Sequence, residues 1–369
     1  MATANGYSTG SPLPKSQIQA MQSVVPLKVT EPRLTRRVKA AGSASAAGLR
    51  RCLHIVLYYR KASGEDSGWL LAGWMKESLG RALEEQPMLA GRLRRGENVG
   101  PGNELEIVSN DNGARLFEAR ISKTLDEFLD LEDRESAEAE LVSWHDIDDQ
   151  NPQFSPLFNV QVTNFSCGGY SVGISSSLLL SSPLAIISFL KKWAKIHHTI
   201  TFASHGVQPI FFFPTFKSNL SVSDVQNGSK KIKTHGRTLI FRTANEKLNS
   251  NGTGDKALVS QCVEEAEILL GKKVASEFLL VKELPVEVRV ENFTKGLLEK
   301  PESSYGISRV SWDELGAREV AFNEGNKPVQ VSCWINSVLG EGLVMVIPSS
   351  DEDISPTNVI VSVPDGIEM

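Results

Sequence analysis

The segment from residue 158 to residue 198 constrains the fold most, because its apolar residues change from a two-residue period to a helical one. Residues 158–163 alternate between apolar and polar side chains, which is typical of a β-strand. A Cys-Gly-Gly turn follows at 167–169, and the alternation resumes over 170–174. Ser182-Pro183 is typical of a helix start, with serine as the N-cap and proline in the first turn. The sequence therefore predicts a β-hairpin followed by a helix that buries Ile186, Phe189, Leu190 and Trp193.

Other segments show the same mixture of strands and helices. The β-forming residues of 53–59 predict a strand, and apolar residues at four-residue spacing predict a helix over 68–85. The second half of the chain predicts a helix near 257–270 and strands near 238–242, 329–335, 343–347 and 359–363. The expected fold class is therefore α/β, or mixed α+β.

The length of 369 residues is too great for one ordinary core and predicts two domains. We expect a flexible N-terminal tail over 1–22, an N-terminal domain over 23–205 and a C-terminal domain over 237–369. The irregular stretch 206–236 would be the crossover linker between the domains. The basic stretch 33–51 is interpreted as a solvated loop, and contact with anionic lipid or a partner is the alternative.

Composition and charge exclude several classes of protein. A net formal charge of −5 gives no sign of a nucleic-acid binder. The four cysteines are scattered without a Cys-x-x-Cys pair, so no metal site is predicted. No apolar stretch has the character of a signal sequence or the length of a membrane span. We therefore expect a cytoplasmic, monomeric protein without a transmembrane segment.

Five fragments occur in order along nearly the whole chain: Pro87–Leu93, Phe165–Gly169, Gly173–Ser175, Phe189–Ala194 and Phe322–Pro328. Together they resemble the plant BAHD (HxxxD-type) acyltransferases. The resemblance implies a two-domain, chloramphenicol-acetyltransferase-like fold of mixed sheets flanked by helices, with a tunnel at the domain interface. It also implies acyl transfer from coenzyme A (CoA) to an alcohol or amine, with no permanently bound cofactor. The C-terminal domain is shorter than is usual in that family.

The catalytic motif of that family, His-x-x-x-Asp-Gly, is lost in this chain. Counting back from Phe189–Trp193 places Leu178, Ser182 and Pro183 at the positions of the histidine, aspartate and glycine. In the family the histidine is the general base that takes the acceptor's proton, and leucine cannot accept a proton. Loss of a general base typically lowers a rate by about 10²–10⁴-fold. No intact catalytic residue is predicted, and Ser176, Leu178, Ser182 and Pro183 are expected to line the tunnel.

The second family motif, Asp-Phe-Gly-Trp-Gly, reads Ala321-Phe-Asn-Glu-Gly325 in this chain. The resemblance gives this region a structural role, which here would be carried by Phe322, Gly325, Lys327 and Pro328. Four cationic residues are candidates to contact a CoA phosphate, although an ordinary charged loop is the alternative: Lys230, Lys231, Lys233 and Arg237.

The remaining histidines do not supply the missing base. His145-Asp-Ile-Asp-Asp149 matches His-x-x-x-Asp by letter, but no strand precedes it, so a solvated loop is predicted. His54 is interpreted as a core histidine, and His197 and His198 as residues that close a helix. Ser182 as an N-cap needs no catalytic role.

These observations lead to one main functional hypothesis and two alternatives. The main one is a non-catalytic, acyl-CoA- or acyl-ligand-binding accessory protein in plant lipid (wax, very-long-chain fatty acid) or specialised metabolism, similar in type to the eceriferum branch. By analogy, its partner would be a fatty-acid elongation enzyme that brings it to the endoplasmic reticulum. The alternatives are a weak O- or N-acyltransferase that works by substrate orientation, with acyl-CoA as donor, and a scaffold with a blocked tunnel.

Overall fold

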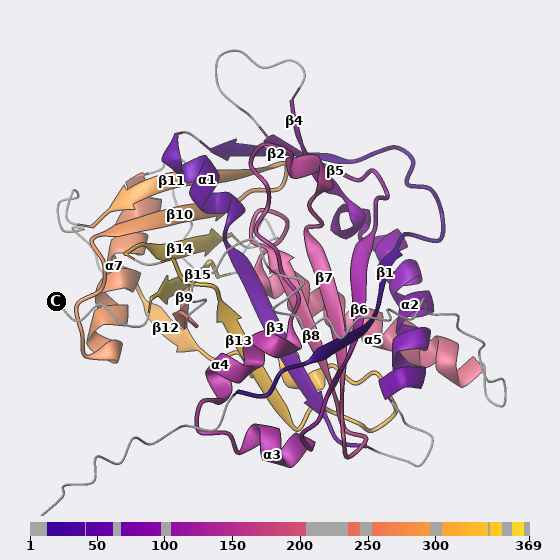
Figure 1. Cartoon of the computed structure of the whole chain (residues 1–369). Coiled ribbons are helices and arrows are strands. Elements are labelled where there is room, and N and C mark those ends of the chain that lie inside the picture. Colours follow the sequence, from indigo (N-terminus) through magenta and orange to yellow (C-terminus); the bar gives the residue numbers. More distant parts are fainter. Residues whose placement is uncertain are drawn as a thin grey trace, which may run out of the picture.

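Two mixed β-sheets with helices packed on them make up the chain (Figure 1). The computed structural model describes residues 13–40, 42–61, 68–96, 105–203, 235–243, 253–295, 305–338, 340–348 and 356–364. The predicted mixed α/β class is confirmed.

The first sheet has six strands and contains the predicted hairpin. Its neighbours are antiparallel except for the parallel pair β6–β7. The strand order is β1 (Gln17–Val24), β6 (Ala114–Ile121), β7 (Phe158–Phe165), β8 (Tyr170–Ser177), β3 (Cys52–Tyr59) and β13 (Gln330–Ile335).

The second sheet has nine strands, and only the pairs β14–β10 and β11–β2 are parallel. The strand order is β12 (Ile307–Val310), β9 (Arg237–Thr243), β15 (Asn358–Val363), β14 (Gly342–Ile347), β10 (Glu277–Glu283), β11 (Glu287–Thr294), β2 (Thr35–Ala40), β5 (Leu105–Val108) and β4 (Arg92–Arg95).

Helices cover the sheets where the strands are apolar. α2 (Gly68–Glu85) and α5 (Pro183–Ala203) pack on each other and on the first sheet, and α7 (Thr253–Leu270) packs on the second sheet. The short helices α3 (Leu125–Leu129) and α4 (Arg134–Glu138) cover the opposite face of the first sheet, and α1 (Ser43–Leu49) lies beside β11. β3 is consequently buried on both faces.

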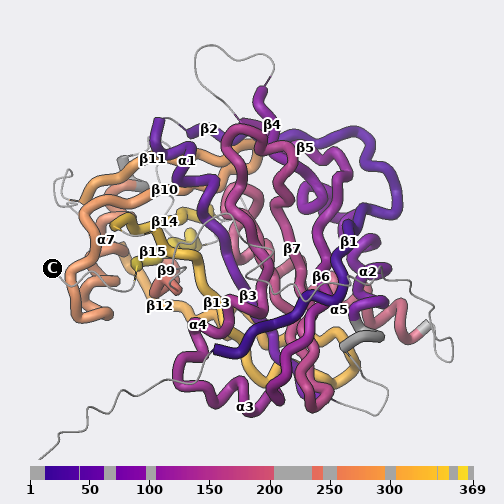
Figure 2. Tube along the Cα trace, viewed as in Figure 1, coloured from indigo at the N-terminus to yellow at the C-terminus, as the bar shows by residue number. Residues whose placement is uncertain are grey.

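Each sheet takes strands from both halves of the chain. β13 comes late in the sequence but pairs with β3 in the first sheet, while β2, β4 and β5 come early and lie in the second. Figures 1 and 2 show β3 and β13 between the rest of the first sheet and the second sheet. A sequence boundary between two domains therefore does not coincide with the division into sheets, and the predicted boundaries stay a prediction.

The local predictions for the hairpin and the helix after it are confirmed. β7 and β8 pair with Val160 opposite Ile174, and Gly168 takes the positive φ of 85° in the turn between them. α5 begins at Pro183 and buries Phe189 and Trp193. The predicted strands and helices of the second half correspond to β9, α7, β13, β14 and β15.

Two predictions for the N-terminal part are wrong. Residues 17–22, assigned to a flexible tail, form most of β1 and bury Ile18 and Ala20 against the sheet. The sequence signal for this strand is weak, because glutamines and small residues alternate with the apolar ones. The stretch 33–51 is not a solvated loop, because it forms β2 and α1, and because Arg36 and Arg51 form ion pairs. The predicted linker 206–236 lies outside the described residues except for His235 and Gly236.

Gly173 in β8 gives a test of this packing. A Cβ at Gly173 would overlap the backbone carbonyl of Leu141. Gly173→Ala should therefore lower the free energy of unfolding by roughly 3 kcal/mol, measured by denaturant unfolding, because the backbone must shift. The matched control is Gly48→Ala in α1, where the added methyl meets Leu179 at an ordinary 3.4 Å. That variant should be neutral or gain up to about 1 kcal/mol from helix propensity. Equal stability of the two variants would contradict this packing.

Candidate functional site

The turn after β8 holds Leu178 and Ser182, the residues that the sequence resemblance predicts at the positions of the catalytic histidine and aspartate. Leu178 lies in this turn, and its N–H donates to the Arg51 carbonyl at 3.1 Å. The Leu178 side chain is 1% exposed and belongs to the main apolar core. Ser182 is also buried, and its Oγ accepts from the N–H of Ala185 at 3.4 Å. Ser182 therefore caps α5, and Pro183 is the first residue of that helix.

The apolar core runs through this turn from one sheet to the other. Leu178, Leu179 and Leu180 belong to one cluster with Leu53 of β3 and Leu343 of β14. Leu179 also lies against α1 near Gly48. Ser176 is buried, and its Oγ donates to the carbonyl of Ser177 at 3.5 Å. The turn 178–180 thus fills this part of the core with apolar volume, and its three leucine side chains cannot accept a proton.

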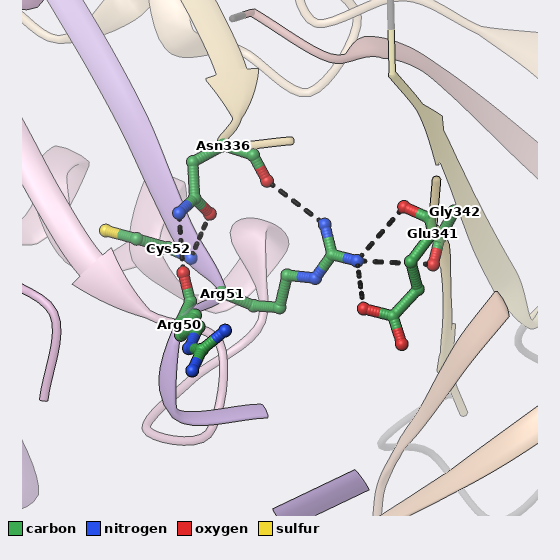
Figure 3. A network of polar contacts seen from close by, with 6 residues as sticks. All are labelled: Arg50, Arg51, Cys52, Asn336, Glu341 and Gly342. Atoms are coloured by element: carbon green, nitrogen blue, oxygen red, sulfur yellow. Dashed lines mark hydrogen bonds and ion pairs between the residues drawn. The ribbon is translucent and has the colours of Figure 1, made fainter. Parts of the chain in front are cut away.

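A buried arginine next to this turn joins the two sheets (Figure 3). Arg51 precedes β3 and is 2% exposed. Its guanidinium donates to the Asn336 carbonyl at 3.3 Å, to the Glu341 carbonyl at 3.1 Å and to the Glu341 carboxylate at 2.9 Å. Burial lowers the pKa of Arg51, and the Glu341 charge opposes that change. The first sheet is therefore held to the beginning of β14 by a charge-assisted network.

Asn336 completes this network on the side of the first sheet. Its Oδ1 accepts from the N–H of Cys52 at 2.7 Å, and its Nδ2 donates to the Arg50 carbonyl at 2.5 Å. The amide side chain thus extends the β3–β13 pairing by one step beyond the last strand residue, Ile335.

A second arginine holds the same turn from the other side. Arg36 of β2 donates to the Leu180 carbonyl at 3.1 Å and forms an ion pair with Glu283 of β10 at 3.1 Å. It also donates to the Leu284 carbonyl at 3.0 Å. The turn 178–180 is therefore fixed by its own apolar side chains and by two hydrogen bonds. One joins Leu178 to the backbone of Arg51, and the other joins Leu180 to the side chain of Arg36.

The second family motif packs on α5 and β3 through its one large apolar residue. Phe322 is fully buried, with ring centroids 4.9 Å from Trp193 and 6.3 Å from Tyr59. The Tyr59 hydroxyl donates to the Val320 carbonyl at 2.8 Å. Gly325 takes a positive φ of 71°, Lys327 is exposed and Pro328 is buried. These contacts support the structural role expected for Phe322.

The other positions of this motif face a surface pocket. The pocket has a volume of about 500 Å³ and lies between α5 and the segment 319–325. Its wall includes Ala321, Asn323, Glu324 and Gly325 but not Phe322. Ala321, Asn323 and Glu324, the three residues that the resemblance predicts to depart from the family motif, therefore all line this pocket.

The structure places three of the histidines that were considered as replacements for the missing base, His54, His145 and His197. His54 is buried and its Nδ1 lies 3.0 Å from the Ser175 hydroxyl, as a core histidine would. His145 is exposed outside helix and strand. His197 is buried inside α5 rather than at its end, which corrects the prediction that it closes the helix.

His197 belongs to a buried polar group under Phe322. Its Nδ1 lies 3.0 Å from the hydroxyl of Ser78, which also accepts from the Trp193 indole at 2.9 Å and donates to the Met75 carbonyl at 3.2 Å. This pattern places the proton of neutral His197 on Nδ1. Burial, with a smaller effect from His198, lowers the pKa of His197 to about 3.

Several predicted residues cannot be placed in a site. Lys230, Lys231 and Lys233 lie outside the described residues, and Arg237 is exposed at the start of β9. Over the described ranges, no three His, Cys, Asp or Glu side chains gather as metal ligands would. None of the helices described is long and apolar enough to cross a membrane. Sequence reasoning missed Arg36, Arg51, Asn336 and Glu341, because their partners are distant in sequence.

Comparison with known proteins assigns the family. The sequence profile described as the Transferase family matches residues 52–267. The chain belongs to this family. The relatives are plant BAHD acyltransferases and eceriferum proteins, as the five fragments indicated.

The relatives differ in how much of their length is matched. Rosmarinate synthase from Plectranthus scutellarioides is 35% identical over 38% of this chain and 30% of its own length. The chain thus spans less than a third of several curated relatives that it matches. Protein ECERIFERUM 2 from Arabidopsis thaliana is 24% identical over 73% of this chain and 78% of its own length. The crystal structure of vinorine synthase is 15% identical, covers 95% of both chains and has a TM-score of 0.47.

Removal of Arg51 should show how strongly the network holds the sheets. Arg51→Met should lower the free energy of unfolding by about 2–4 kcal/mol, because several carbonyls and the Glu341 carboxylate lose their donor. Arg50→Met is the matched control, because Arg50 is exposed and its backbone carbonyl, rather than its side chain, accepts from Asn336. That variant should stay within about 0.5 kcal/mol of wild type in the same denaturant titration. An equal loss in both variants would refute the special role of Arg51.

The His197 environment predicts a pH dependence. The unfolded imidazole binds a proton below pH 6.5, whereas the folded one stays neutral down to about pH 3. Acidification from pH 7 to pH 5 should therefore remove about 2 kcal/mol of stability through this group. His197→Gln keeps a hydrogen-bonding side chain but does not titrate, so its stability should fall less over this range. Unfolding curves collected at several pH values test this, and parallel losses in the two proteins would contradict it.

Proposed function

We propose that this BAHD-family chain does not catalyse conventional acyl transfer and acts as an accessory protein that binds acyl-CoA or an acyl ligand. The observation that carries the proposal is the buried, core-forming Leu178 at the position of the family's general base. A side chain without a proton acceptor cannot take the proton of an attacking alcohol. Ser182, at the aspartate position, has its Oγ engaged as the cap of α5.

The cellular role follows from the eceriferum resemblance. Protein ECERIFERUM 2 is matched over 73% of this chain, which supports a role of the eceriferum type. We place the chain in plant wax or very-long-chain fatty-acid metabolism, with a fatty-acid elongation enzyme as its partner. It would act as a cytoplasmic monomer and reach the endoplasmic reticulum through that partner. Arg237, with Lys230, Lys231 and Lys233, would contact the CoA phosphates.

The alternative is a weak acyltransferase that works by substrate orientation alone. The 35% identity to rosmarinate synthase over 140 residues favours it. A direct test is calorimetric titration of the protein with long-chain and hydroxycinnamoyl-CoA thioesters, followed by a transfer assay with alcohols and amines. Binding without turnover supports the accessory role. Turnover above the uncatalysed rate supports the alternative, and no heat with any donor contradicts the ligand-binding part.

Restoring the motif would show whether the missing base is the reason for inactivity. Leu178→His with Ser182→Asp should raise transfer by about 10²-fold or more if both substrates still bind. Leu179→His with Ser181→Asp is the matched control, because it makes the same changes one position away. Both proteins must first be shown to be folded by circular dichroism, since each adds polar groups near the core. Equal rates in the two variants would show that the apolar filling, and not only the lost base, prevents transfer.

A further inference from the structure

The pocket between α5 and the segment 319–325, here called the α5 pocket, has two walls of opposite charge. Its volume of about 500 Å³ lies in the range of small-molecule sites. Lys191, Lys195 and His198 come from one face of α5, at spacings of four and three residues. Glu319, Asn323 and Glu324 come from the facing segment.

One pair of these charges is already neutralised. Lys191 and Glu319 form an ion pair at 3.0 Å, and the Lys191 ammonium lowers the pKa of the Glu319 carboxyl. This pair joins the two walls. The other two charged side chains of the pocket, Lys195 and Glu324, have opposite signs.

Two opposite charges remain on facing walls. Within the part of the chain that the structure describes, Lys195 and Glu324 form no ion pair with each other or with another side chain. Both line the pocket, together with the half-buried His198 and Asn323 as hydrogen-bonding groups. Gly325 also lines the pocket, and a Cβ at that position would have no atom within 4 Å, so the space beside it is open.

We propose that the α5 pocket binds a small zwitterion, with its anionic group at Lys195 and its ammonium at Glu324. A purely anionic ligand would meet the Glu324 carboxylate, and a purely cationic one would meet Lys195, so each would be opposed by one wall. A zwitterion satisfies both walls at once, and the imidazole of His198 can add a hydrogen bond. This site is separate from Leu178 and does not depend on acyl-CoA binding.

The test uses probes of one chain length that differ only in charge. γ-Aminobutyrate carries both charges, butyrate only the negative one and n-butylamine only the positive one. Glycine and 6-aminohexanoate vary the separation of the charges. Binding to the full chain is measured by ligand-observed NMR at physiological salt. We expect at least one of the amino acids to bind at least about tenfold more tightly than either singly charged probe.

Variants locate the binding. Lys195→Gln and Glu324→Gln should each weaken binding of the amino acid at least about tenfold, and both positions are exposed, so folding should be retained. Lys192→Gln is the matched control, because Lys192 is an exposed neighbour on α5 that does not line the pocket. It should bind as wild type does. Failure of every amino acid to bind, equal binding of butyrate, or equal effects of all three variants would overturn the proposal.

Discussion

The buried guanidinium of Arg51 is the interaction on which the arrangement of the two sheets depends. It is attached to the first sheet through β3, and its donors reach Asn336 and Glu341, which lie between β13 and β14. An uncompensated charge at 2% exposure would be costly, so the segment after β13 must follow the path that supplies these oxygens. That constraint explains why β13 can pair with β3 in one sheet while the next strand, β14, enters the other.

The same constraint explains the conformation of the turn after β8. The Arg51 carbonyl holds the N–H of Leu178, and Arg36 holds the carbonyl of Leu180, so the backbone of this turn is fixed at both ends. With the backbone fixed, the three leucines can only point into the core that both sheets share. The turn therefore contributes apolar packing, because its three leucines are buried in that core.

Local sequence patterns predicted the elements well and their pairing poorly. The hairpin β7–β8, helix α5 and the buried strand β3 follow from periodicity, turn glycines and a Ser-Pro cap, which are local signals. β2 was missed because its run of Thr, Arg and Lys contains one fully buried apolar residue, Val38. The pairing of β13 with β3 in the first sheet could not be predicted from local patterns. It depends on Arg51 and Asn336, which are separated by 285 positions. The motif positions Leu178 and Ser182 were found only through the family resemblance, and their burial and capping required the structure.

The distribution of charge separates the parts of the molecule that hold the fold from those that remain open to ligands. Arg36 and Arg51 are paired and largely buried, and each links elements of different sheets or of distant sequence. Lys195 and Glu324 are exposed, and the groups that face them across the α5 pocket have the opposite sign. Phe322 anchors that wall in the core, next to the neutral His197, so the backbone behind the pocket is held by buried contacts. A wall that is held in place by the core is preorganised for a ligand, because little conformational freedom is lost on binding.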